Sequence, residues 1–204
     1  MSEQIKPLLS MILITFLLTG CTLFSGKSAI QQQPLDAAKR EQQLLLLNQF
    51  SLQASLGVRT PDENISGNLS WQQHNSSYQA RLNNFLGISL FELNQTPTGS
   101  DILIRGEHYY DTDAGSLLLQ LSGWSIPLTD MPLWLKGLPG ENSADIEYDE
   151  HGRAIAFVLT DSNGIRWQLQ YLSFFNDAMS LPKTLQLHST DTRIKLVIRN
   201  WQFL

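Results

Sequence analysis

The sequence has few of the residues that crosslink or charge a protein. It contains one cysteine, Cys21, and charged side chains make up only 16% of its 204 residues. A single cysteine excludes an intramolecular disulfide and argues against a thiolate metal cluster. The 14 basic and 19 acidic residues give a net charge of −5, and the basic ones are scattered. This balance argues against nucleic-acid binding, and the length predicts one domain with a single core.

Motifs that would indicate catalysis are also missing. The sequence contains neither His-Glu-x-x-His nor Gly-x-Ser-x-Gly, and it has no phosphate-binding glycine loop. The acidic cluster at 145–150 lacks the loop signature of a Ca²⁺ site, so a solvated strand face explains it better. The four histidines are far apart and are best explained as exposed turn or strand residues: His74, His108, His151 and His188. We therefore predict that the protein is not an enzyme and holds no metal or cofactor.

The sequence has no apolar run long enough to cross a bilayer comfortably. Residues 6–18 start with a lysine and continue with about a dozen mainly apolar residues, whereas a spanning helix needs about 20. The run ends in Leu18-Thr19-Gly20-Cys21, with small residues before the cysteine. This arrangement predicts a signal peptide over residues 1–20.

The segment Leu18-Thr19-Gly20-Cys21 also resembles the bacterial lipobox. The resemblance implies that Cys21 is diacylated on sulfur, becomes the new N-terminus and is then N-acylated. Thr22, in place of an aspartate, implies delivery to the outer membrane by similarity to sorted lipoproteins of Gram-negative bacteria. The alternative is an ordinary signal peptide followed by a free, buried cysteine.

The rest of the chain divides into a tether and a domain. Residues 21–34 are predicted to form the lipidated N-terminus and a tether, because Ser, Gly, Gln and Lys dominate after Cys21. Residues 35–204 carry the periodic patterns of one folded domain, which begins with a predicted helix over 35–48.

Apolar and polar residues alternate from residue 50 onward, which indicates strands with one wet face. Turn sequences such as Ser162-Asn163-Gly164 separate the strands and are short enough for antiparallel hairpins. We count about ten or eleven strands. Because consecutive hairpins must hide their apolar face and their edges, we predict a barrel or a strongly bent sheet.

The alternation stops in the middle of the chain, where two helices are predicted. Residues 113–122 form the first, with Thr112 or Asp113 as the N-cap and Gly123 just past the end. Residues 131–136 form the second. Two apolar helices inserted in a meander have to lie on the sheet, so we expect them to plug or cover its concave face.

One connection between predicted strands is apolar where a tight turn should be polar. Residues 83–88 read Asn-Asn-Phe-Leu-Gly-Ile, which places Phe85 and Leu86 at the centre of the loop. An exposed apolar tip is typical of a membrane or partner contact. The alternative is that the tip folds back under its own loop.

These features together resemble the LolB family of outer-membrane lipoprotein receptors. The resemblance covers essentially the whole chain. Besides the lipobox, tether and antiparallel strands, it rests on four stretches: Asn84-Phe85-Leu86-Gly87, Gly123-Trp124-Ser125-Ile126-Pro127-Leu128, Trp134 with Gly137-Leu138-Pro139-Gly140, and Arg193-Ile194-Lys195-Leu196 to Trp201.

The resemblance implies a half-closed antiparallel β-barrel covered by short helices, similar to the soluble periplasmic carrier LolA. It also implies a lipid-anchored domain that faces the periplasm, accepts lipoproteins from LolA by binding their acyl chains in a hydrophobic cavity, and inserts them into the outer membrane without nucleotide. Leu86 matches the loop leucine associated with insertion, with Phe85 and Gly87 beside it. The expected partners are LolA, client lipoproteins and outer-membrane lipid, and we expect a monomer.

The wall of the cavity is predicted from strand alternation and helix spacing. It consists of six inward apolar residues: Trp71, Leu117, Leu121, Trp134, Leu135 and Trp167. A slip of one residue in register would reverse a strand's faces. The alternative is a filled core in an outer-membrane scaffold or assembly lipoprotein that uses the apolar loop to dock. A lipid-active enzyme would need a convergent catalytic site that no spacing reveals.

Overall fold

The computed structural model describes residues 35–204, and the predicted signal peptide, Cys21 and the tether lie outside the described residues. The described chain forms three helices, α2 (Ala37–Leu46), α3 (Ala114–Ser122) and α4 (Met131–Trp134). Its eleven strands are β1 (Gln49–Arg59), β2 (Asn64–His74), β3 (Ser77–Asn83), β4 (Ser89–Thr96), β5 (Gly99–Ile104), β6 (Glu107–Asp111), β7 (Ser143–Tyr148), β8 (Ala154–Thr160), β9 (Arg166–Phe174), β10 (Pro182–His188) and β11 (Arg193–Phe203).

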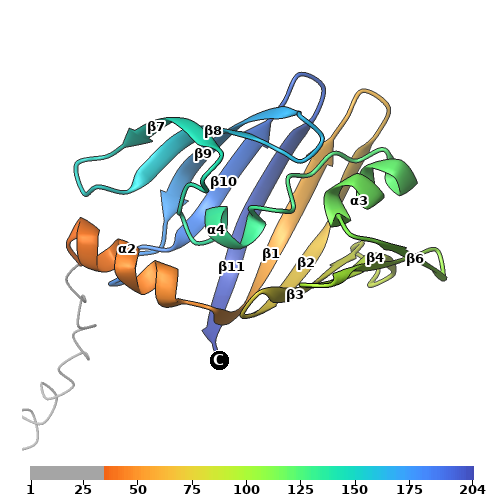
Figure 1. Cartoon of the computed structure of the whole chain (residues 1–204), viewed down its shortest axis with the longest axis horizontal. Helices are drawn as coiled ribbons and strands as arrows, with labels where there is room; N and C mark the ends of the chain where they lie inside the picture. Colours follow the sequence, from red (N-terminus) through yellow and green to blue (C-terminus); the bar gives the residue numbers. More distant parts are fainter. Residues whose placement is uncertain (1–34) are drawn as a thin grey trace, which may run out of the picture. The chain divides into compact units, whose positions relative to one another are not determined.

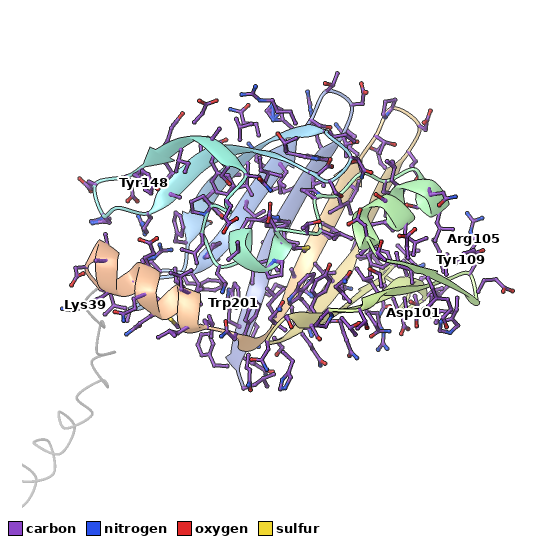
Figure 2. The ribbon with its side chains drawn as sticks, viewed as in Figure 1. Lys39, Asp101, Arg105, Tyr109, Tyr148 and Trp201 are labelled. Carbon is purple, nitrogen blue, oxygen red and sulfur yellow. The ribbon has the colours of Figure 1, made fainter. Side chains whose placement is uncertain are left out.

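All the strands belong to one antiparallel sheet with the order β6-β5-β4-β3-β2-β1-β11-β10-β9-β8-β7. Strands β1 to β6 form one arm and β7 to β11 the other, and the pairing of β1 with β11 joins the arms. The sheet curves but its edge strands β6 and β7 do not pair (Figure 1). Tyr109 of β6 and Tyr148 of β7 accordingly lie on opposite sides of the view in Figure 2. The predicted fold class, a half-closed antiparallel barrel of ten or eleven strands, is confirmed.

One face of the sheet is apolar because the register aligns the inward residues of neighbouring strands. Leu52 of β1 lies opposite Trp71 of β2, and Trp71 lies opposite Ala80 of β3. The row continues through Leu93 of β4 and Ile102 of β5, and all five side chains are buried. Since side chains alternate along a strand, the intervening polar residues occupy the opposite face.

The two central helices begin and end close to the predicted residues. The Asp113 carboxylate caps α3 by accepting the Ser116 N–H at 2.9 Å, and Gly123 ends that helix with φ +76°. This left-handed conformation favours glycine. Helix α4 is shorter than predicted and ends at Trp134, because i to i+3 hydrogen bonds tighten the chain into turns before Gly137.

The helices cover the apolar face of the sheet. α3 and α4 lie in front of that face in Figure 1, and Trp134 of α4 belongs to the same buried cluster as Trp71 of β2. Leu44 of α2 packs with Leu138 and Leu181 in a second, smaller cluster. Both clusters and the eleven strands are built from the described residues 35–204. Among the described helices, none has the length and apolar character needed to cross a membrane.

Candidate functional site: the covered interior and the β3–β4 loop

The six predicted wall residues all lie in the interior between the sheet and the helices. Trp71, Leu117, Trp134, Leu135 and Trp167 are buried in the main core, and the half-buried Leu121 packs against it. Alternation and helix spacing therefore placed these side chains on the inner side.

The interior contains a small apolar cavity beneath the α4 region. A cavity of about 20 Å³ lies between β1 to β4, β11 and the α4 region, which is room for about one water molecule. Its lining is entirely apolar: Leu56, Leu69, Trp71, Ala80, Phe91, Ile126, Leu128, Met131, Trp134, Ile194 and Leu196. Of the six predicted residues, only Trp71 and Trp134 line it. An acyl chain therefore requires the covering segment to move.

Sequence reasoning missed the wall residues that precede and begin α4. Ile126, Leu128 and Met131 face the small cavity although two of them lie outside any regular element. Their signal was the apolar stretch Ile126-Pro127-Leu128, which has no helical or strand period and so could not be assigned to a face. We call residues 123–139 the lid, because they contain α4 and cover this part of the sheet.

Hydrogen bonds join the start of the lid to two turns of the sheet. The Trp124 indole N–H donates to the Glu63 carboxylate at 2.5 Å, and the Ser125 hydroxyl donates to the Asp161 carboxylate at 3.3 Å.

Further hydrogen bonds hold the part of the lid around α4, both to the rest of the structure and within the lid itself. The buried Tyr171 hydroxyl donates to the Trp134 carbonyl at 2.5 Å, and the Trp134 indole N–H donates to the Pro127 carbonyl at 3.2 Å. The Lys136 ammonium donates to the Leu47 carbonyl at 3.1 Å. Burial raises the pKa of Tyr171 well above its usual value and lowers the pKa of Lys136. The closed lid thus satisfies its buried polar groups.

Helix α3 is fastened to the β8–β9 turn at its N-terminus. The Asp113 carboxylate accepts the hydroxyls of Ser116 at 2.6 Å and Ser162 at 2.8 Å. Partial burial raises the pKa of Asp113, but these hydrogen bonds outweigh it and hold the pKa below its usual value. At neutral pH, Asp113 is therefore ionised and ties the helix to the sheet.

The β3–β4 loop presents its apolar side chains to solvent. Phe85 is 75% exposed, Leu86 85% and Ile88 60%, so the tip does not fold back. The Asn84 side-chain oxygen accepts the N–H groups of Leu86 (2.9 Å) and Ile88 (3.0 Å), and Gly87 adopts φ +82°. The backbone is therefore organised around Asn84 to hold the apolar tip outward. The predicted insertion loop comprised Phe85, Leu86 and Gly87, and the structure adds the exposed Ile88 to its apolar surface.

The acidic cluster at 145–150 serves local ion pairs. Asp145 pairs with Arg166 at 3.1 Å and Asp149 with Arg153 at 2.6 Å. The register of β7 is irregular between Ala144 and Glu147, so the simple alternation assumed for this segment does not hold. Within the described residues, no group of three or more His, Cys, Asp or Glu side chains is arranged to hold a metal ion.

Comparison with known proteins gives the same family from sequence. Residues 48–201 match the family described as outer membrane lipoprotein LolB. The chain is 35% identical over 156 residues to the outer-membrane lipoprotein LolB of Shewanella baltica (strain OS223), which covers 76% of this chain and 72% of that protein. It is 30% identical over 200 residues, 95% of each chain, to the LolB of Tolumonas auensis (strain DSM 9187).

Comparison of structures agrees at the level of the fold. A LolA superfamily protein from Nitrosomonas europaea superimposes with a TM-score of 0.53 at 8% sequence identity, over 83% of this chain and 94% of that one. At this identity the likeness concerns the fold alone. The extent of the sequence match decides the family: the chain belongs to the LolB family of outer-membrane lipoproteins.

Proposed function

We propose that this protein is a non-catalytic outer-membrane receptor that accepts lipoproteins from LolA, binds their acyl chains beneath the lid and inserts them into the outer membrane. The observation that carries the proposal is the combination of an apolar cavity lining beneath the lid with an exposed apolar loop. The family supports the same reading.

The physical need for such a receptor follows from the acyl chains of its clients. Exposing each CH₂ to water costs about 0.8 kcal/mol, and a lipoprotein carries tens of them. Free diffusion across an aqueous compartment is therefore excluded. Transfer has to pass between apolar interiors in contact, from the protein that binds the chains more weakly to the one that binds them more tightly, and then into the bilayer.

In this proposal, binding begins with displacement of the lid. The interior is filled by Ile126, Leu128, Met131 and Trp134, so acyl chains take the place of these side chains against the sheet. Opening exchanges one apolar contact for another, and its main cost is the loss of the hydrogen bonds that join the lid to Tyr171, Leu47, Glu63 and Asp161. The receptor thus stays closed when empty.

The apolar loop supplies the delivery step. Phe85, Leu86 and Ile88 together offer a bilayer a compact apolar wedge, and Asn84 fixes its shape. We assign insertion to Leu86, the most exposed of the three, with Phe85 enlarging the apolar surface.

A transfer assay with residues 33–204 tests the proposal. The segment is incubated with LolA-bound lipoprotein, and cargo is measured first on the receptor and then in liposomes. Leu86→Glu should accept cargo normally but deliver at least tenfold less, because placing a carboxylate in lipid costs roughly 3 kcal/mol relative to leucine. Leu46→Glu makes the same change on α2, at a leucine that is 70% exposed, and should deliver normally. Normal delivery by Leu86→Glu would remove the loop from the mechanism.

Attachment through Cys21 is the second part of the proposal. Several acyl chains on one N-terminus anchor a protein firmly, because each buried CH₂ contributes about 0.8 kcal/mol. Mass spectrometry of the mature N-terminus should show a lipidated Cys21, and Cys21→Ala should yield an unanchored protein. An unmodified cysteine in the mature protein would refute the lipobox assignment.

A scaffold lipoprotein with a filled core is the second candidate, and the small interior space favours it. Displacement of a fluorescent fatty acid separates the two functions. Saturable binding to residues 33–204 requires an interior that opens, whereas no binding up to the solubility limit of the probe supports the scaffold.

A further inference from the structure

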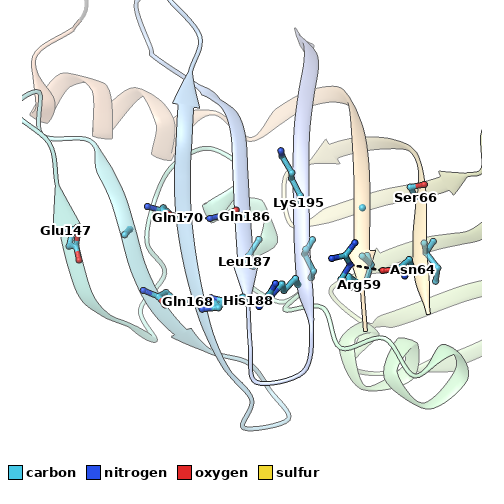
Figure 3. A pocket seen from close by; sticks show the side chains of 16 residues that line it. Arg59, Asn64, Ser66, Glu147, Gln168, Gln170, Gln186, Leu187, His188 and Lys195 are labelled. Atoms are coloured by element: carbon cyan, nitrogen blue, oxygen red, sulfur yellow. Dashed lines mark hydrogen bonds between the residues drawn. The ribbon is translucent and has the colours of Figure 1, made fainter. Parts of the chain in front are cut away.

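A wide hollow lies on the face of the sheet that the helices leave uncovered. It is a groove of about 760 Å³ lined by residues of β1, β2 and β7 to β11, most of them on β9, β10, β11, β1 and β2. Figure 3 shows the side chains that line it projecting from this face, with α2 and α4 behind the sheet. The proposed function does not use this groove.

Strand register arranges the polar lining of the groove in two rows that cross the five strands. The first row, at the strand ends, is Gln168, His188, Arg193, Arg59 and Asn64. The second row, next to it on the same face, is Gln170, Gln186, Lys195, Gly57 and Ser66. Cations therefore occupy the middle of the groove and amides its two sides.

The central cations have no carboxylate partners within residues 35–204. Arg59 and Arg193 lie directly opposite each other across β1 and β11, an arrangement that destabilises a sheet when nothing compensates the charges. Among the described residues, Arg59, Arg193 and Lys195 form no ion pair with a carboxylate. The one acidic lining residue, Glu147, lies on the far side of the groove from Arg59 (Figure 3).

The guanidinium of Arg59 is held in place by a neutral partner. Its Nε donates to the Asn64 side-chain oxygen at 2.8 Å, drawn as a dashed line in Figure 3. This bond fixes the orientation of the group without neutralising it, and leaves the terminal nitrogens for an oxyanion. The planar fork of an arginine matches two phosphate oxygens.

Small residues make the hollow. Gly57 separates Lys195 from Ser66 in the second row and contributes no side chain, and Ala156 lies opposite Gln170. A β carbon built on Gly57 would meet only the Ile65 carbonyl oxygen, at 4.0 Å, so the space above it is open. The groove therefore has open space above Gly57, next to the cations, and we call this part of the groove its floor.

The charge is local to the groove. The neighbouring β1–β2 and β10–β11 turns carry Asp62, Glu63 and Asp191, none of which lines it. The end of the molecule as a whole is not basic, which disfavours a general attraction to anionic surfaces and favours a discrete site.

We propose that this groove binds a phosphate group carried on a polyhydroxylated group such as glycerol or a sugar. Arg59, Arg193 and Lys195 bind the phosphate oxygens. The amides of Gln168, Gln170 and Gln186, which both donate and accept hydrogen bonds, bind the hydroxyls. The ligand compensates the facing arginines.

Calorimetric titration of residues 33–204 with glycerol 3-phosphate tests the site, with glycerol at the same ionic strength as the control ligand. We expect saturable binding of glycerol 3-phosphate and no binding of glycerol. Arg193→Gln should weaken it at least tenfold, because charge-assisted hydrogen bonds are lost. Gly57→Val keeps every charge but fills the floor, and should weaken binding to a similar extent. Arg199→Gln removes a charge from β11 outside the groove and should bind normally.

Vesicle flotation with the same variants identifies the source of the phosphate. Binding of the soluble compound shows that the site takes a free phosphate ester. Retention only on vesicles containing phosphatidylglycerol, with the same order of variants, shows that it takes a lipid headgroup. Absence of binding in both experiments, or equal weakening by Arg193→Gln and Arg199→Gln, would overturn the proposal.

Discussion

The two faces of the sheet differ in the volume of the hollow that each one carries. The apolar face encloses about 20 Å³ beneath the lid, whereas the polar face leaves a groove of about 760 Å³ open. An apolar void loses packing contacts on every side and attracts no water, so the chain closes it. A polar groove is filled by water and can stay open. The size of a hollow therefore does not show where an acyl chain binds; the chemistry of its wall does.

The same comparison explains how an apolar interior can be shielded from water when no acyl chain is bound. In the proposed mechanism the closed lid occupies the place of the acyl chains, and it is held there by hydrogen bonds that include those of Tyr171 and Lys136. Affinity for acyl chains is then reduced by the cost of opening. Changes that loosen the lid should lower stability and raise affinity together.

The largest expected effect on the free energy of unfolding comes from replacing Trp134, the lid residue whose indole packs into the interior. Trp134 is 2% exposed, lines the small cavity and anchors α4. Trp134→Ala should lower the free energy of unfolding by about 3–5 kcal/mol, because it leaves a void in the core. Urea denaturation of residues 33–204 measures the loss. A loss below about 1 kcal/mol would show that the lid contributes little to the closed state, contrary to the comparison of the two faces.

A smaller and more specific effect is expected from Tyr171→Phe. The change removes the hydroxyl that donates to the Trp134 carbonyl but keeps the ring, and that carbonyl still accepts the Gly137 N–H at 3.2 Å. We expect a loss of about 1 kcal/mol in unfolding free energy. If this loss falls on the closed lid, fatty-acid affinity should rise about fivefold, the factor that corresponds to 1 kcal/mol.

Fatty-acid displacement and urea denaturation of Tyr171→Phe have to be read together. Reduced stability with unchanged affinity would show that the hydroxyl supports the core but does not restrain the lid. Tyr78→Phe is the matched control, because Tyr78 is also buried against the sheet but stacks on Trp71 and makes no hydrogen bond to the lid.

The strands could be predicted from sequence because burial follows local alternation. Phe50 to Val58 alternate with polar residues, and the structure buries Phe50, Leu52, Ala54, Leu56 and Val58 on one face. The exposed loop was predictable for a similar reason, since a tight turn around Asn84 leaves Phe85 and Leu86 no route to the core. Both features depend on contacts between residues close in sequence.

The closed interior and the polar groove could not be predicted, because they depend on long-range register. Ile126 faces Trp71 across the small cavity only after the lid folds over β2, and its own segment has no period. Arg59 and Arg193 are 134 positions apart and meet only through the pairing of β1 with β11. The scattered basic residues were therefore interpreted only as an argument against nucleic-acid binding, although the sheet gathers three of them in the groove.

Lys136 offers a test of the lid through pH. Burial lowers its pKa below the usual value of 10.5, so the folded state releases the proton at a lower pH than the unfolded state. The cost of burying the ammonium is fully present below the folded pKa and disappears as pH rises toward 10.5. The unfolding free energy of the parent chain should therefore rise relative to that of Lys136→Met between neutral pH and pH 10.5. A constant difference in urea titrations at each pH would show that the lid leaves Lys136 hydrated.

The smallest effect on the unfolding free energy is expected on the polar face of the sheet. There the Gln186 side chain donates to the Gln170 side-chain oxygen at 3.0 Å, and both side chains are exposed to solvent. Water replaces that bond when it is lost, so Gln186→Ala should change the unfolding free energy by no more than about 0.5 kcal/mol. Fatty-acid affinity should stay the same, since the change is on the side of the sheet away from the lid. Urea denaturation alongside Trp134→Ala makes the comparison direct. A loss from Gln186→Ala that approached the loss from Trp134→Ala would mean that the groove is a packed second interior, and the contrast between a sealed face and a wet one would fail.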